Sequence, residues 1–110
     1  MNIEHKELAK GRWGQMSLIE QMANIGSEVN RAFNWRKKGK EDFSKKAFYR
    51  ALELLDLTVC FHKKYSQLKE ILRVREALVD FFYGDNEFSS TEILWCKYFD
   101  QFAYAVRRKY

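Results

Sequence analysis

Residues 41–61 read EDFSKKAFYRALELLDLTVCF, and their apolar positions share one broad helical face. Apolar residues recur here every three or four positions, which is the repeat of an α-helix. Two neighbouring stripes make this face wide, and a helix of that kind is expected to sit deep in a bundle. The first stripe is Phe43, Ala47, Ala51, Leu54 and Thr58, and the second is Phe48, Leu52, Leu55 and Val59.

The preceding segment predicts another helix, from Ser17 to about Arg36. Ser17 is followed three residues later by Glu20, a capping-box pattern in which each side chain bonds the backbone N–H of the other residue. Gly39 tolerates the left-handed backbone of a helix C-cap and marks the end of the helix. The inward face is Leu18, Met22, Ile25, Val29 and Phe33.

Two further helices are predicted downstream, over about 66–83 and 89–108. Gly84 ends the first of them, and the polar residues 85–87 form a turn. Ser89, with Glu92 three residues later, repeats the capping-box pattern and predicts the start of the last helix.

No proline interrupts the 110 residues. Because proline is the commonest breaker of helices, its absence favours long helices joined by short turns. Short turns favour an up-down-up-down arrangement. Residues 1–16 show no sustained apolar period. The sequence therefore predicts an all-α fold, with an up-down-up-down four-helix bundle over 17–110 and an N-terminal arm over 1–16.

Apolar residues make up 46% of the chain and aromatic residues 16%, which is enough for a single hydrophobic core. This aromatic content exceeds what a small core hides, so some rings are expected at the surface. Exposed apolar patches usually mark partners, and we therefore expect a homo-oligomer. Trp13, Trp35 and Trp95 are candidates for protein contacts.

The start of the chain, MNIEHKELAK, is too polar for a signal peptide. No apolar run approaches the roughly 20 residues that span a bilayer. Cys60 and Cys96 lack the CxxC spacing of redox or metal sites, and both are interpreted as small buried hydrophobes. These features predict a cytoplasmic protein without a membrane partner.

The net charge of +5 is unevenly distributed. Residues 31–50 hold eight basic side chains against two acidic ones, whereas residues 80–92 hold four acidic side chains and no basic one. Such asymmetry favours either a polyanionic partner or head-to-tail pairing between copies.

Metal and nucleophilic chemistry find little support in the sequence. The two histidines, His5 and His62, have no acidic or histidine partner at helical spacing, and His62 is interpreted as a solvated loop residue. The glycines are scattered and form no phosphate loop. We therefore predict no enzyme activity, no cofactor and no metal.

Two acidic pairs nevertheless suggest a magnesium-dependent nucleotide pyrophosphohydrolase as a remote alternative. The pairs are Glu53 with Asp56 and Glu76 with Asp80. Arg50 and Arg73 each lie three residues before a pair and would compete with a cation for its carboxylates. The favoured interpretation is a polar network between helices. Its predicted members are Asn24, Glu28, Arg31, Arg50, Glu53, Arg73 and Glu76.

The remaining signal for function is a set of basic residues next to aromatic ones. Cations neutralise phosphates and aromatic faces stack on unpaired bases, so this pairing indicates RNA or single-stranded DNA. In an up-down-up-down bundle, residues 62–64 and 107–109 would meet at one end. The predicted nucleic-acid-binding residues are Arg36, Lys37, Lys38, Lys63, Lys64, Arg107 and Arg108.

Residues 18–60 resemble the small bacterial four-helix-bundle proteins of the ribosomal intervening-sequence type. Asn24, Ile25 and Glu28 correspond to an Asn-Ile-(Ala)-Glu-Gly motif of that family, although Val29 replaces its glycine and one extra residue precedes Glu28. The second motif corresponds to Phe48, Ala51, Glu53 and Leu54. Residues 84–87 and 97–99 also resemble a group of uncharacterised small helical bacterial proteins.

One branch of that family is the accessory protein of diversity-generating retroelements. The resemblance implies a basic, ring-shaped homo-oligomer that binds a reverse transcriptase and its RNA, without catalysis of its own. The leading hypothesis is therefore a non-enzymatic nucleic-acid-binding accessory subunit. The alternative is a protein-interaction module without nucleic-acid binding, of the toxin-antitoxin or phage-related kind.

Overall fold

Four long α-helices follow one another in the computed structural model, which describes residues 11–62 and 64–109. They are α2 (Leu18–Lys37), α3 (Glu41–Phe61), α4 (Tyr65–Tyr83) and α5 (Glu92–Lys109). Residues 11–14 are also helical, and the described residues contain no strand. None of these helices is both long and apolar enough to cross a bilayer. The all-α class predicted from the apolar spacing is confirmed.

The sequence signals that bound α2 are confirmed. The Oγ of Ser17 accepts the backbone N–H of Glu20 at 3.1 Å, and the Glu20 carboxylate accepts the N–H of Ser17 at 3.1 Å. Gly39 follows the helix with a φ of 76°, in the left-handed region where a residue with a Cβ is strained. α3 then begins at Glu41, as the sequence predicts.

The predicted start of the last helix is wrong. Ser89 lies outside α5 and has a φ of 53°. Thr91 caps the helix instead, because its Oγ1 accepts the N–H of Leu94 at 3.1 Å. Ser89 does not cap α5, because the residues immediately before it form a separate turn.

Hydrogen bonds from two side chains hold the loop between α4 and α5. The Asp80 carboxylate accepts the N–H groups of Glu87 and Phe88 at 3.0 and 3.1 Å. The Asn86 side chain donates to the carbonyl of Ser90 at 2.9 Å and accepts its N–H at 3.0 Å. These bonds fix the shape of the loop and so influence how α5 is placed relative to α4.

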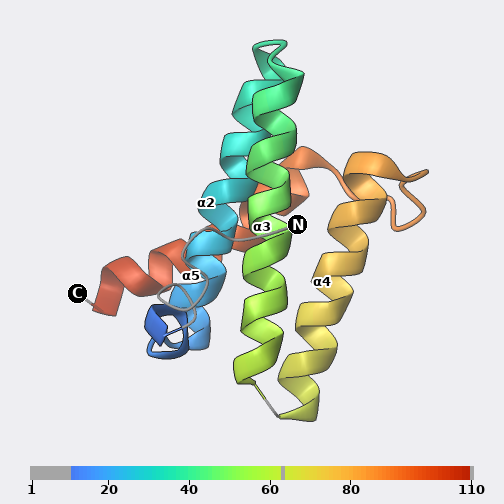
Figure 1. Ribbon diagram of the computed structural model, residues 1–110. Coiled ribbons are helices and arrows are strands. Elements are labelled where there is room, and N and C mark those ends of the chain that lie inside the picture. Colours follow the sequence, from blue (N-terminus) through green and yellow to red (C-terminus); the bar gives the residue numbers. More distant parts are fainter. Residues whose placement is uncertain (1–10, 63, 110) are drawn as a thin grey trace.

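The helices do not all alternate in direction (Figure 1). α2 and α3 run side by side in opposite directions, and α4 runs antiparallel to α3 on its other side. α5 instead crosses the α2–α3 pair at a steep angle. The predicted up-down-up-down order is thus followed by α2, α3 and α4 and not by α5.

The crossing of α5 over α2 depends on a glycine. A Cβ placed on Gly26 would lie 2.6 Å from the Cβ of Phe99, closer than two carbon atoms approach without displacement. The missing side chain lets the two helices touch at this point. A close contact between residues far apart in sequence therefore accompanies the departure of α5 from the predicted order.

The hydrophobic core lies where α2, α3 and α5 meet. Its largest fully buried apolar side chains are Phe48, Phe99, Met22, Ile25, Leu55, Ile71 and Leu78. α4 supplies the last two of these. Phe82 also ties the end of α4 to the core, because its ring lies 5.3 Å from that of Phe33 and 4.0 Å from that of Phe48. Such aromatic contacts stabilise beyond the area they bury.

Residues 11–16, the described part of the predicted arm, include a tryptophan that joins the core. Trp13 is buried, and its indole N–H donates to the Thr58 hydroxyl at 2.9 Å. Gln21 donates to the Trp13 carbonyl at 2.9 Å and contacts His62 Nε2 at 2.6 Å. Trp13 is therefore not a surface contact, and the half-buried His62 is not simply solvated. Residues 1–10 of the arm lie outside the described residues.

The two cysteines have different surroundings. Cys60 is exposed, so the prediction that it is a buried hydrophobe is wrong. Cys96 is half-buried, and its thiol lies 3.5 Å from the Asn30 side-chain oxygen. Burial raises the pKa of the Cys96 thiol, with the Glu92 and Asp100 carboxylates acting in the same direction. These features favour the neutral thiol at Cys96.

Candidate functional site

The turn between α2 and α3 combines aromatic rings with lysines at one end of the molecule (Figure 1). The rings of Trp35 and Phe43 lie 4.8 Å apart at an angle of 30°. Lys38 Nζ lies 5.4 Å from the centre of the Trp35 ring, and Lys46 Nζ lies 5.8 Å from that of Phe43. Phe43 is 49% exposed. We refer to residues 35–46 as the α2–α3 tip.

Most cations of the α2–α3 tip form no ion pair with a carboxylate of the described residues. Lys37 is the exception, because its Nζ lies 2.6 Å from a Glu92 carboxylate oxygen, and this hydrogen bond and charge raise the pKa of Lys37. Arg36 lies over the Phe82 ring, 5.6 Å from its centre. The exposed tip cations that form no ion pair with a described carboxylate are Arg36, Lys38, Lys40, Lys45 and Lys46.

The predicted second basic cluster does not form. The turn between α3 and α4 lies at the bottom of Figure 1, whereas the end of α5 lies at the left side of the molecule. Lys64 is exposed at the turn, and Arg107 and Arg108 are exposed near the end of α5. Lys63 lies outside the described residues. The predicted convergence required α5 to run antiparallel to α4, and its crossing of α2 separates these cations.

Three of the seven residues predicted to form a polar network, Glu28, Arg31 and Arg50, lie together between α2 and α3. A Glu28 carboxylate oxygen accepts from Arg31 at 3.1 Å, and the other, Oε2, lies 3.6 Å from Arg50 and has no hydrogen bond within the described residues. The Glu28 side chain is only 12% exposed. Burial raises the pKa of Glu53, and the nearby Arg50 partly opposes this shift. Glu28 is therefore the centre of the α2–α3 part of the network.

The remaining predicted members lie elsewhere. Asn24 donates to the carbonyl of Glu20 at 2.8 Å, one turn earlier in its own helix. Arg73 and Glu76 form no ion pair with a described residue. α3 and α4 are bridged instead by Arg75 and Asp56, whose Nε and Oδ1 atoms are 2.8 Å apart. Sequence spacing missed this pair because its partners lie on different helices.

One member of each acidic pair of the magnesium alternative is engaged in another contact. Asp56 binds Arg75, and Asp80 accepts backbone N–H groups of the following loop. Within the described ranges, no group of three or more His, Cys, Asp or Glu residues gathers as metal ligands. The geometry offers no support for a magnesium site at these residues.

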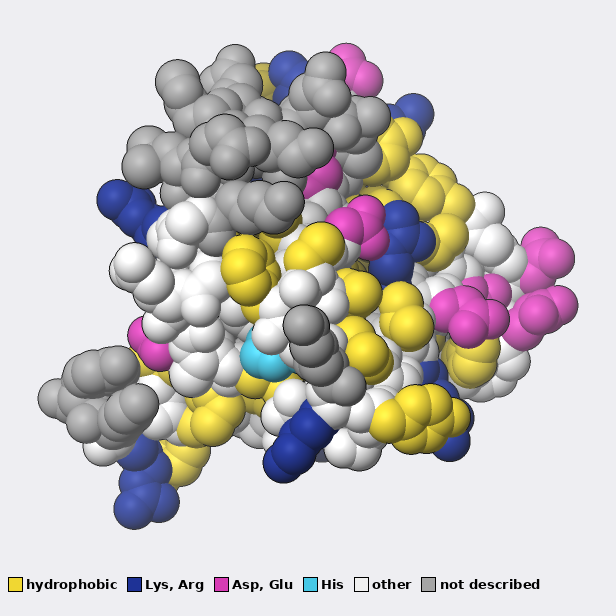
Figure 2. Space-filling view, turned by 60° about the horizontal axis from the view of Figure 1, so that its bottom comes forward, with side chains coloured by type: hydrophobic (Ala, Val, Ile, Leu, Met, Phe, Trp, Pro, Cys, Tyr) yellow, Lys and Arg dark blue, Asp and Glu magenta, His cyan; other side chains and the backbone are white. Residues whose placement is uncertain are grey.

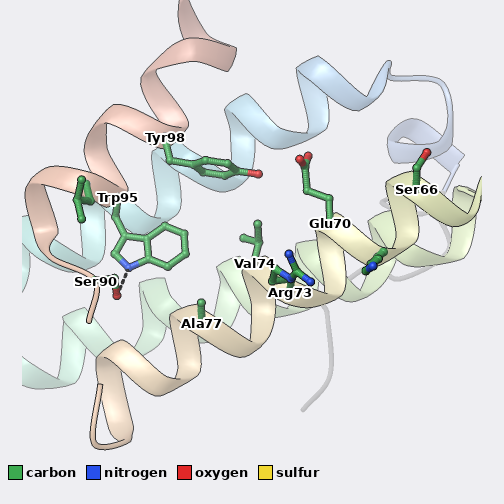
Figure 3. Close-up of a pocket in the computed structure, with 10 residues that line it drawn as sticks. Ser66, Glu70, Arg73, Val74, Ala77, Ser90, Trp95 and Tyr98 are labelled. Atoms are coloured by element: carbon green, nitrogen blue, oxygen red, sulfur yellow. Dashed lines mark hydrogen bonds between the residues drawn. The ribbon is translucent and has the colours of Figure 1, made fainter. Parts of the chain in front are cut away.

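A groove that the sequence did not reveal lies between α4 and α5 (Figure 3). Its volume is about 530 Å³. The α4 side is lined by Ser66, Lys69, Glu70, Arg73, Val74 and Ala77. Ser90, Leu94, Trp95 and Tyr98 line the other side. Trp95, predicted as a protein contact, is buried in this wall with 7% of its surface exposed.

Two aromatic side chains contribute polar groups to the groove, the Trp95 indole N–H and the Tyr98 hydroxyl. The Trp95 indole N–H donates to the Ser90 hydroxyl at 3.0 Å, which fixes the orientation of the ring. The Tyr98 hydroxyl points across the groove towards Glu70 (Figure 3). It is buried and forms no well-aligned hydrogen bond within the described part of the chain. Burial and the Glu70 carboxylate raise the pKa of Tyr98 far above its ordinary value, so its hydroxyl is a neutral donor.

The outer side of α4 carries a second, shallower hollow of about 430 Å³. Tyr65, Leu68 and Leu72 line it at helical spacing, and Tyr65 is 78% and Leu72 51% exposed. Figure 2 shows hydrophobic side chains gathered across the centre of the face that includes the α3–α4 turn, with acidic side chains at its right edge. We refer to Tyr65, Leu68 and Leu72 as the α4 stripe.

Comparison with models of protein families, with curated proteins and with solved structures finds no match to this chain. The resemblance to the intervening-sequence bundle proteins therefore stays a prediction from residues 18–60.

Proposed function

We propose that the protein binds single-stranded nucleic acid through the α2–α3 tip. The observation that carries this proposal is the Trp35–Phe43 ring pair with Lys38 and Lys46 lying on its rings. Exposed rings stack on unpaired bases, and lysines beside them neutralise the adjoining phosphates. Double-stranded nucleic acid offers no free base faces, so a single strand suits this surface better.

The electrostatic part of the interface includes the tip cations that lack acidic partners. Five such side chains lie within residues 36–46, and their combined field attracts a polyanion. Lys37 is expected to contribute less, since Glu92 neutralises it at 2.6 Å. Lys64 is exposed at the α3–α4 turn and lies apart from the exposed pair Arg107 and Arg108 near the end of α5, so these cations would act as secondary contacts with a longer strand.

The role that follows is a non-enzymatic accessory subunit that holds a nucleic acid for another protein. The proposal includes that this other protein is a reverse transcriptase. Only the sequence resemblance of residues 18–60 supports that part of the proposal. Copurification of the chain with a polymerase from its native cells would support that part of the proposal.

Fluorescence anisotropy with a labelled single-stranded RNA at two salt concentrations tests the tip. Affinity for a single strand falls with salt, with a slope of about 0.7 in log–log units for each phosphate contacted. The double variant Lys38→Gln/Lys46→Gln should bind more weakly and lower the slope by about 1.4 if each lysine contacts one phosphate. Phe43→Ala should weaken binding while leaving the slope unchanged, because stacking releases no counterions.

A matched control removes two cations elsewhere. Arg12 and Lys97 are exposed and lie outside the tip. Arg12→Gln/Lys97→Gln lowers the net charge by the same amount and should keep wild-type binding. Equal losses in the two double variants would show that net charge and not the tip determines affinity. Absence of binding by the wild type at low salt would overturn the proposal.

The α4 stripe favours self-association as a second candidate function. A second copy is the occupant that charge suggests, because the hollow is lined by both cations, Lys69 and Arg73, and an acid, Glu76. Antiparallel pairing of two α4 helices would place these cations of one copy opposite Glu76 of the other.

Sedimentation equilibrium tests this pairing. Leu72→Glu should shift the protein from dimer to monomer by placing a carboxylate within the apolar contact. Ile19→Glu is a matched control, since Ile19 is 45% exposed and lies on α2. A wild-type protein that stays monomeric, or equal effects of both variants, would contradict pairing through α4.

A further inference from the structure

The groove between α4 and α5 is large enough to hold a small molecule. Its volume of about 530 Å³ lies within the range of about 300–1,000 Å³ typical of ligand pockets. The bonds of Asp80 and Asn86 shape the loop that joins the two helices, and α5 is packed against α2 through Gly26. These contacts hold the walls of the groove independently of any occupant.

The floor of the groove suits a flat apolar ring. Val74, Ala77 and Trp95 are each at most 9% exposed, and they contribute its apolar surface. Figure 3 shows the Tyr98 ring along one wall, with Val74 and Ala77 on the facing helix. Trp95 cannot turn freely because its indole N–H is bonded to Ser90. A planar ligand would therefore meet a preformed surface.

The edge of such a ring would meet one donor and one acceptor. The buried Tyr98 hydroxyl forms no well-aligned hydrogen bond within the described residues. Burial raises its pKa, and the Glu70 carboxylate lies near enough to add to this shift by its charge and by hydrogen bonding. A buried donor that is poorly bonded is destabilising. The Glu70 carboxylate faces it across the groove. A ring edge that carries a carbonyl or ring nitrogen beside an N–H group would satisfy both side chains, whereas a purely aliphatic ligand would satisfy neither.

An anionic group on the ligand is also favoured. Lys69 and Arg73 line the groove beside Glu70 and form no ion pair with a described carboxylate. Arginine binds phosphate through two parallel N–H donors, which fixes the position of the group as well as attracting it.

We propose that the α4–α5 groove binds one nucleotide unit. The base lies on the apolar floor with its edge between Tyr98 and Glu70, and the phosphate binds Arg73 and Lys69. This inference rests on the proposed function in that the nucleotide would belong to the strand that the α2–α3 tip holds. The two sites share no residue, so each can be removed without the other.

NMR spectroscopy with ribonucleoside 5′-monophosphates tests the groove directly. The indole N–H signal of Trp95 should shift on titration, and protons of the ligand base should receive saturation from the protein. Arg73→Gln should weaken mononucleotide binding about tenfold, as expected for loss of a charge-assisted contact. Tyr98→Phe keeps the ring and removes the hydroxyl, so it should weaken binding about fivefold.

Three outcomes separate this inference from the proposed function. The tip variant Lys38→Gln/Lys46→Gln should lose affinity for the RNA strand and keep mononucleotide binding, which would support both. RNA binding that depends on the tip, without any shift of Trp95 by mononucleotides, would overturn the groove inference alone. Mononucleotide binding without RNA binding by the wild type would support a nucleotide site and overturn the proposed function. Circular dichroism of each variant shows whether it is folded.

Discussion

α2 and α5 touch so closely that Gly26 has no room for a side chain, whereas α4 is separated from α5 by a groove of about 530 Å³. The first region buries Met22, Ile25 and Phe99 almost completely. The second leaves Leu94, which lines the groove, 54% exposed. Stability is therefore expected to concentrate in α2, α3 and the faces of α4 and α5 that pack on them, while the groove and the outer side of α4 provide surfaces that are open to ligands and partners.

The largest effect is expected from removing a ring at the α2–α5 contact. Phe99→Ala should lower the free energy of unfolding by about 3–5 kcal/mol, because the ring is fully buried and leaves a cavity. Urea denaturation followed by circular dichroism measures this loss.

The same substitution in an exposed position is its control. Phe88 lies in the loop after α4 and is 50% exposed. Phe88→Ala should cost no more than about 0.5 kcal/mol. Similar losses for both variants would break the contrast between the packed region and the open one.

Gly26 provides a sharper test of the contact between the two helices. Gly26→Ala should destabilise the protein by up to about 2 kcal/mol, since overpacking costs about 1–3 kcal/mol and the better helix propensity of alanine returns about 1 kcal/mol. Phe99→Ala should rescue it only in part, because alanine removes the Cγ and Cδ1 atoms that the new Cβ would meet at 2.9 and 3.0 Å but keeps the Cβ at 2.6 Å.

Gly11→Ala is the matched control for this prediction. Gly11 lies in the described helical residues 11–14, and a Cβ there meets nothing within 4 Å. Its replacement should leave the melting temperature unchanged or slightly raised. A stable Gly26→Ala variant would show that the helices can separate at low cost.

The ends of α2 and the contact of α2 with α5 show what the sequence could and could not predict. Ser17, Glu20 and Gly39 act on their immediate neighbours, so their patterns predicted the bounds of α2. The apolar stripes of residues 41–61 likewise predicted α3. Neither kind of signal specifies which helix a face will meet, and the crossing of α5 depends on Gly26 and Phe99, which are 73 positions apart in the printed sequence.

The candidate site divides in the same way. Arg36, Lys37 and Lys38 of the α2–α3 tip are neighbours in sequence and were predicted, whereas Lys40, Lys45 and Lys46 were not. The approach of Phe43 to Trp35 required the turn between them. The groove was not predicted because its walls come from two helices whose separation no local pattern encodes. The predicted start of α5 was wrong because Ser89 and Thr91, two residues apart, are both residue types that cap helices. The geometry of the loop makes Thr91 the cap.

Alkaline pH should reduce stability through tyrosines on α4 and α5. Burial, followed by the hydrogen bond of Tyr49, raises the pKa of Tyr83 to about 12, and burial also raises that of Tyr98. A raised pKa keeps the hydroxyl protonated in the folded protein while the unfolded chain ionises. This stabilisation is complete below about pH 10 and is lost as the pH rises towards 12.

Urea denaturation at pH 9 and at pH 11 measures this loss. Tyr98→Phe should remove more of the difference between the two pH values than Tyr83→Phe, because Tyr83 is 49% exposed and the Tyr98 hydroxyl is buried. The reverse order would show that the wall of the groove is more open to water than the upper end of α4.

The smallest effect is expected from the ion pair that bridges α3 and α4. Arg75 and Asp56 are 37% and 60% exposed, so a double-mutant cycle should give a coupling of about 0.2–1 kcal/mol that declines with added salt. The cycle for Arg50 and Glu28 should give a larger value, because Glu28 is 12% exposed and its charge is less screened. If the α3–α4 pair gave the larger and salt-insensitive coupling, electrostatics would anchor α4 as firmly as packing anchors α5. α4 and α5 would then differ in the kind of interaction that holds them, electrostatic for α4 and packing for α5, and not in how tightly they are held.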